Sequence, residues 1–261
     1  MGGGRKRPEG KCRICGGVGP LSWEHVPPEA AYNNQRLVRA AQEQMLKPER
    51  WDGVRGQIEQ RGGGDYTLCE PCNNKTGTWY AAEYVRWARQ GLDRLARIPD
   101  HEENAFFVPF RGRPLRFLKQ VVTMVFSANG ADFAPRHPEL VEFVLDWRAT
   151  GLPPQYKIDL VLARGGFARQ SGVSGMVDLS NGAAEFSSEI AHFPFALRLI
   201  VGGEHRTRRG ALEQFAQFGP DDEGEAWLYT IAGHVVTKFP GDYRSRERAD
   251  REAAQSIAEL E

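Results

Sequence analysis

Residues 68–77 read LCEPCNNKTG, and this stretch carries the strongest local signal in the chain. Cys69 and Cys72 are separated by two residues, a spacing at which one turn of chain can present two thiolates to one metal ion. Two asparagines and Lys75 follow directly. Asparagines at this point either cap the first turn of a helix or belong to a chemical site. Which of the two applies depends on the residues elsewhere in the chain that can meet this stretch.

The cysteines form two pairs. All four lie within the first 72 residues, as Cys12 with Cys15 and Cys69 with Cys72. Two C-x-x-C pairs with none left over indicate a zinc site, and we expect no disulfide framework in a chain without an export signal. Four sulfur ligands leave no open position on zinc, so the predicted role is structural. Two unrelated thiol pairs, or a redox C-x-x-C, are the alternatives.

Composition limits the class of protein. The 261 residues suffice for two domains, and 41% of them are apolar. The formal net charge is zero, although residues 1–99 carry 16 basic and 11 acidic side chains. A mildly basic first part is compatible with a polyanionic partner, whereas the balanced total argues against non-specific coating of nucleic acid. No apolar run is long enough for a membrane span. The N-terminus has no secretory pattern, so we expect a cytoplasmic protein without membrane contact.

The first segment, residues 1–99, is predicted to be one domain that ends near a polar, proline-containing link at 97–104. An alternating run at 21–26 predicts a strand, which two prolines then end because proline removes a ladder donor. Three more elements are predicted: a helix over 35–47, a strand over 54–60, and a long helix from Cys72 to about Ala96.

The long helix carries apolar side chains at helical spacing, namely Tyr80, Tyr84, Trp87 and Leu95. These aromatic rings are candidates for stacking on nucleic-acid bases. A stripe of this kind is more often the buried face of a helix, and we favour the core.

Residues 105–261 are predicted to form a second, α+β domain with a mainly antiparallel sheet, because strand candidates follow one another with short turns. The predicted helices cover 114–128 and 137–151, and a solvated helix or frayed end covers 244–260. The predicted strands cover 156–163, 174–180, 192–202 and 225–239.

WEHVPP, residues 23–28, lies between the cysteine pairs and places Glu24 next to His25. Glutamate is a hard oxygen donor suited to Mg²⁺ or Mn²⁺. Histidine has an unperturbed pKa near neutrality, as a general base requires. Neighbours on a strand face opposite ways, so a loop or twist must aim both groups at one site. A lone histidine after a strand is usually structural, and the pair is what favours catalysis.

Together these motifs resemble the HNH, or His-Me finger (ββα-metal), endonucleases. The resemblance rests on Cys12 and Cys15, then an acidic residue–His pair with a proline turn, then a C-x-x-C-N sequence that ends in Asn73 and opens a helix. It is closest to the zinc-stapled subgroup found among phage recombination endonucleases, and the pattern is also similar to unassigned bacterial HNH proteins. The match covers roughly residues 10–97 and implies an N-terminal ββα-metal domain stapled by zinc.

The resemblance also implies roles for individual residues. His25 would deprotonate the attacking water, while Glu24 and Asn73 would hold one catalytic Mg²⁺ or Mn²⁺ ion against the scissile phosphate. Lys75 is expected to contact a phosphate, and Asn74 to support the nucleic-acid site. A solvated lysine and a helix-capping asparagine are the alternatives for these two. The implied partner is DNA, and the pattern does not separate DNA from RNA.

The sequence departs from the family in two respects. The acidic ligand is glutamate, where aspartate is more usual. The middle asparagine that orients the catalytic loop is not obvious, and its candidates are Asn33, Asn34, Gln60 and Asp65.

Two alternatives to a constitutively active endonuclease stay open. The first is a non-catalytic zinc-stapled module that binds nucleic acid or acts as a scaffold. The second is a bacterial defence effector nuclease whose domain at 105–261 senses a ligand or an activating protein; otherwise that domain would serve substrate recognition or assembly. Cleavage of both strands with one active site per chain would require a homodimer.

Overall fold

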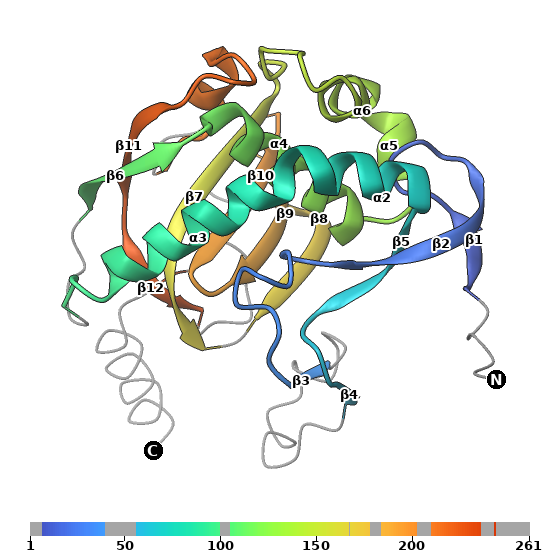
Figure 1. Cartoon of the computed structure of the whole chain (residues 1–261), viewed down its shortest axis with the longest axis horizontal. Coiled ribbons are helices and arrows are strands. Elements are labelled where there is room, and N and C mark those ends of the chain that lie inside the picture. Colours follow the sequence, from blue (N-terminus) through green and yellow to red (C-terminus); the bar gives the residue numbers. More distant parts are fainter. Residues whose placement is uncertain are drawn as a thin grey trace.

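The computed structural model describes residues 7–39, 56–99, 105–166, 168–177, 184–202, 210–235 and 243. It confirms the predicted fold class: the described chain is α+β, its sheets are mainly antiparallel, and a strand–strand–helix unit lies near the cysteines (Figure 1). The helix predicted at 244–260 lies outside the described residues.

The N-terminal unit is built on a three-stranded antiparallel sheet in the order β1-β2-β5. The strands are β1 (Glu9–Lys11), β2 (Val18–His25) and β5 (Gly64–Cys69). Between β2 and β5, a small ribbon pairs β3 (Leu37–Arg39) with β4 (Gln57–Glu59). The strand expected at 54–60 is thus confirmed at its centre. The helix expected over 35–47 is wrong at 37–39, because Val38 pairs with Ile58 as a strand, and its remainder from 40 onward lies outside the described residues.

A continuous helical segment follows β5. It consists of α2 (Glu70–Thr76), a π-helical turn η2 (Gly77–Ala81) and α3 (Ala82–Leu95). The segment begins at Glu70, two residues earlier than expected, with a proline in its first turn where no helical N–H partner is required. The predicted apolar face is confirmed as core, since Tyr80, Tyr84 and Trp87 are at most 1% exposed.

The second segment supplies a five-stranded sheet in the order β12-β7-β10-β9-β8, antiparallel except for the β12–β7 pair. A separate ribbon pairs β6 with β11. The strands are β6 (Phe106–Gly112), β7 (Tyr156–Gly166), β8 (Arg169–Val177), β9 (Ala184–His192), β10 (Phe195–Val201), β11 (Gly224–Thr230) and β12 (Ala232–Val235). The helices are α4 (Pro114–Ala128), α5 (Phe133–Arg136), α6 (Pro138–Leu145) and the 3₁₀ turn η3 (Glu213–Gln217).

Two predicted elements need correction. The helix expected to continue to Gly151 ends at Leu145, because Asp146 turns to extended backbone and its side chain accepts the Arg148 N–H at 2.9 Å. The strand expected over 225–239 is two strands, β11 and β12, which belong to different sheets. By contrast, α4 has the predicted bounds.

Helix α4 lies at the centre of the molecule, between α3 and the five-stranded sheet (Figure 1). Trp87 of α3 stacks on Phe117 of α4 with 4.5 Å between ring centroids. One cluster of buried residues extends from Cys12 in the first segment to Ala232 in the second. The two segments therefore share a hydrophobic core, while their division into two domains at 97–104 stays a prediction. No helix in the described part of the chain is long and apolar enough to cross a membrane.

Candidate metal and catalytic sites

The four cysteines converge on one point. Cys12 and Cys15 lie in the turn after β1, Cys69 ends β5, and Cys72 lies in the first turn of α2. Their sulfur atoms all lie within 4.8 Å of one another, and the Cys15–Cys69 separation is 3.7 Å. Zinc–sulfur bonds of about 2.3 Å in a tetrahedron place neighbouring sulfurs about 3.8 Å apart. The prediction that these cysteines form one metal-binding group is confirmed, and their donor set fits zinc.

The electrostatics of the cysteine cluster favour a cation. The thiol of Cys72 donates a hydrogen bond to the sulfur of Cys12, which lowers the pKa of Cys12 to about 4. The same contact, together with burial, raises the pKa of Cys72. Cys12 and Cys72 are buried, whereas Cys69 is half-buried and Cys15 is exposed. A metal ion can replace the shared protons and stabilise all four thiolates.

Glu24 lies near the end of β2 and is only 7% exposed. Its Oε2 atom accepts hydrogen bonds from Thr67 Oγ1 of β5, at 3.2 Å, and from Ser127 Oγ of α4. Burial raises the pKa of Glu24 to about 7, against the opposing effect of the two hydroxyl groups. A carboxylate that has lost its water in this way interacts strongly with any cation that approaches it.

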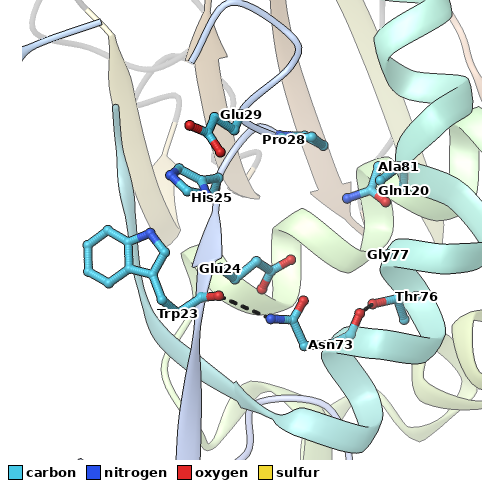
Figure 2. A pocket seen from close by; sticks show the side chains of 10 residues that line it. All are labelled: Trp23, Glu24, His25, Pro28, Glu29, Asn73, Thr76, Gly77, Ala81 and Gln120. Carbon is cyan, nitrogen blue, oxygen red and sulfur yellow. Dashed lines mark hydrogen bonds between the residues drawn. The ribbon is translucent and has the colours of Figure 1, made fainter. Parts of the chain in front are cut away.

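Asn73 faces Glu24 from the first turns of α2. Its Nδ2 atom donates to Trp23 O at 3.1 Å and to Ser22 Oγ at 3.0 Å, while Ser22 itself donates to the carbonyl of Leu68. A carbonyl can only accept, so the NH₂ group must be on this side of the amide. Figure 2 shows the amide oxygen directed toward the Glu24 carboxylate. Two oxygen acceptors that face one another suit a hard divalent cation between them.

His25 is the last residue of β2 and lines the same pocket as Glu24 and Asn73 (Figure 2). The pairing of β2 with β5 is irregular between Ser22 and Trp23, where β5 contains an extra residue. Such a bulge increases local twist, and it occurs just before the two adjacent residues that both reach the pocket. The pocket has a volume of about 190 Å³.

The hydrogen bond of His25 determines its tautomer. Its Nε2 atom lies 3.1 Å from the carbonyl oxygen of Arg61. Because that oxygen has no proton to give, Nε2 carries the hydrogen, and Nδ1 of the neutral ring holds a free lone pair. A ring fixed in this way has the electronic state that a general base needs.

Asn33 joins the two loops that flank the site. It is 1% exposed, and its Nδ2 atom donates to Pro27 O at 2.6 Å and to Gly63 O at 2.7 Å. Its Oδ1 atom accepts the Gly63 N–H at 2.7 Å. Gly62 has φ +85°, and a Cβ there would lie 1.9 Å from Asn33 O, so only glycine fits beside this contact. The loop that carries the Arg61 carbonyl is thereby fixed.

The other candidates for the middle asparagine lie differently. Asp65 accepts a hydrogen bond from the N–H of the next residue at 2.8 Å. Asn34 and Gln60 are exposed. Asn33 is the candidate that is buried and joins both loops.

Lys75 and Asn74 do not lie in the pocket wall. Both are exposed on α2, and the Lys75 ammonium lies 6.0 Å from the centroid of the Trp79 ring. Their predicted contacts with nucleic acid stay predictions.

Residues of α4 and β5 that belong to no sequence motif complete the surroundings of the site. Ser127 and Thr67 contact Glu24, and Gln120 lines the pocket. One signal was present: Gln120 and Ser127 are polar and lie seven residues apart on one face of a mostly apolar helix.

Comparisons with known protein families, with curated proteins and with solved structures find no match.

Proposed function

We propose that the protein is a metal-dependent endonuclease of the HNH type that hydrolyses phosphodiester bonds in DNA. The observation that carries this proposal is the arrangement of three side chains in one pocket: the Glu24 carboxylate and the Asn73 amide oxygen face one another, and His25 is held as the Nε2–H tautomer beside them. The cysteine cluster next to α2 serves as a structural zinc site and fixes where Asn73 lies.

In the proposed reaction, Nδ1 of His25 accepts a proton from a water molecule. The water oxygen forms a bond to phosphorus while the bond from phosphorus to the 3′-oxygen breaks, so the products carry a 5′-phosphate and a 3′-hydroxyl. Glu24 and Asn73 would hold Mg²⁺ or Mn²⁺, and the bound ion would supply positive charge to the phosphate and to the departing oxygen. Asn33 keeps the Arg61 carbonyl against His25 and so maintains the reactive tautomer.

The first test is cleavage of supercoiled and linear DNA by the purified chain in Mg²⁺ or Mn²⁺. His25→Ala is expected to lower the cleavage rate by at least about 100-fold, the scale of a lost general base. Zinc content should be unchanged. His192→Ala is the matched control, because this half-buried histidine of β9 bonds the Phe193 carbonyl outside the pocket.

Equal cleavage by wild type and His25→Ala would contradict the catalytic assignment. DNA binding without cleavage, unaffected by His25→Ala and without a second bound cation, would favour the non-catalytic zinc-stapled module. Cleavage that begins only when a cell extract or nucleotide is added would favour the regulated defence effector.

A further inference from the structure

Gln120 is a buried amide in the wall of the pocket that the proposed mechanism does not use. It belongs to α4, is 3% exposed, and lies across the pocket from His25 (Figure 2). Its Oε1 atom is buried and has no hydrogen-bond partner within the described part of the chain. The figure shows its amide nitrogen turned toward the pocket.

Neighbouring polar groups on the same helix are satisfied. Lys119 Nζ donates to the Asp146 carbonyl at 2.6 Å, and Thr123 Oγ1 donates to the Lys119 carbonyl at 2.9 Å. Buried polar side chains are nearly always hydrogen-bonded, because burial removes the water that would otherwise serve them. Gln120 is the exception on α4, and this exception borders the pocket. Within the described part of the chain the Gln120 amide makes no hydrogen bond, and a ligand that enters the pocket meets its Nε2–H side.

The charge of the pocket indicates what kind of ligand group would bind there. Its wall contains the carboxylates of Glu24 and Glu29 and, among the residues that line it, no lysine or arginine. A phosphodiester in this pocket would therefore obtain positive charge from a bound cation rather than from a side chain. Its remaining oxygens would need neutral N–H donors.

The donors of the pocket wall differ in their availability. The NH₂ group of Asn73 is bonded to Trp23 O and Ser22 Oγ, and Nε2 of His25 is bonded to Arg61 O. Figure 2 shows the indole of Trp23 directed away from Gln120. The amide of Gln120 is the donor that faces the pocket with its hydrogens uncommitted.

We propose that Gln120 contacts the substrate, and that its Nε2–H group donates a hydrogen bond to a non-bridging oxygen of the scissile phosphodiester. This inference rests on the proposed nuclease function. The donor would be positioned before the reaction, beside the oxygen that gains negative charge in the transition state. The C-terminal segment would then contribute a substrate-binding group to the active site.

The test uses Gln120→Met, which keeps the length of the side chain and removes the donor, and Gln120→Glu, which replaces the donor by a negative charge. We expect the single-turnover cleavage rate to fall by about 10- to 1000-fold in Gln120→Met, the scale for loss of one transition-state donor, and further in Gln120→Glu. Binding of Mn²⁺ to the DNA-free Gln120→Met protein, its zinc content and its melting temperature should match wild type. Thr123→Val, one turn away on α4, is the control for changing a buried polar group.

A second measurement separates contact from structural support. The two non-bridging oxygens are replaced by sulfur one at a time, because sulfur is a weaker acceptor. We expect one substitution to slow wild type in a way that Mn²⁺ does not relieve, and to cause no additional slowing in Gln120→Met. A Gln120→Met rate within twofold of wild type, or unchanged sulfur effects at both positions, would overturn the Gln120 proposal alone. Absence of cleavage by wild type under any metal would overturn the nuclease proposal and this inference with it.

Discussion

At the scale of single residues, Asn73 uses the two ends of one amide for different purposes. The NH₂ end is bonded to the backbone of β2 and to Ser22, and this leaves the oxygen directed at Glu24. Ser22 can accept from Asn73 because its own proton goes to the Leu68 carbonyl. The orientation of the oxygen is therefore set by a short chain of hydrogen bonds between β2, β5 and α2. Aspartate at this position would lack the donor on which the orientation depends.

Ser127 is predicted to support cation binding through Glu24. Its hydroxyl donates to Oε2 of the carboxylate, and groups that orient a metal ligand typically account for 10- to 100-fold in metal affinity. We expect Ser127→Ala to weaken Mn²⁺ binding by about 10-fold, measured by calorimetry on the zinc-loaded protein. Ser188→Ala is the control, because Ser188 is equally buried in β9 and bonds Ser171 O instead. Equal Mn²⁺ affinity of Ser127→Ala and wild type would show that Ser127 does not orient Glu24.

At the scale of elements, α4 is the helix on which both segments depend. Its bounds were predictable, because Pro114 opens a long apolar run with helical spacing. The contacts of its polar side chains were not predictable, because their partners lie far away in the sequence. Ser127 contacts Glu24 across 103 residues, and no local pattern encodes that meeting.

Strand β9 was also not predictable from the sequence. Its segment reads AEFSSEIAH and lacks the apolar alternation that predicts a strand. Even so, Ser187, Ser188 and Glu189 are buried, because β9 lies between β8 and β10, and Arg169 of β8 forms an ion pair with Glu189. A polar strand can lie inside a sheet when its partners satisfy it, and those partners appear only in the folded chain.

Lys119 of α4 is predicted to make stability depend on pH. The side chain is fully buried against the ring of Phe143, and burial lowers its pKa from about 10.5 to about 8. Between these values the unfolded chain binds more protons than the folded chain, so folding becomes more favourable as pH rises. A shift of this size lowers the free energy of unfolding by about 3 kcal/mol below pH 8. This loss disappears as pH rises toward 10.5.

We therefore expect Lys119→Met to be more stable than wild type at pH 7.5, by about 1–3 kcal/mol. The advantage should shrink as pH approaches 10. Urea unfolding of both proteins in saturating zinc, at several pH values, measures the difference between their free energies of unfolding. Other titrating groups contribute equally to both proteins and cancel in this difference. A difference that does not change with pH would show that Lys119 is not destabilised by its burial.

At the scale of the whole molecule, hydrogen bonds connect the cysteine cluster to the pocket. Arg13 lies between the first two cysteines. Its backbone N–H donates to Thr67 O at 2.9 Å, and its guanidinium donates to Ser127 O at 2.6 Å. Thr67 and Ser127 are the two residues whose hydroxyls contact Glu24. The pattern of cysteines predicted the metal-binding group, but this link to α4 depends on tertiary contacts that the pattern does not contain.

Loss of zinc is therefore expected to affect the second cation as well. Cys15→Ser removes one ligand at the exposed side of the cluster, and a structural zinc site of this type contributes roughly 10 kcal/mol or more to folding. We expect lower zinc content, a lower melting temperature, proteolysis within the N-terminal unit, and at least a 10-fold loss of Mn²⁺ affinity. Chelation of zinc from wild type should give the same result. Val18→Ser is the control, since this residue of β2 is 83% exposed. If Cys15→Ser lost zinc but bound Mn²⁺ as wild type does, the pocket would be independent of the staple, and the link through Arg13 would have no role in positioning Glu24.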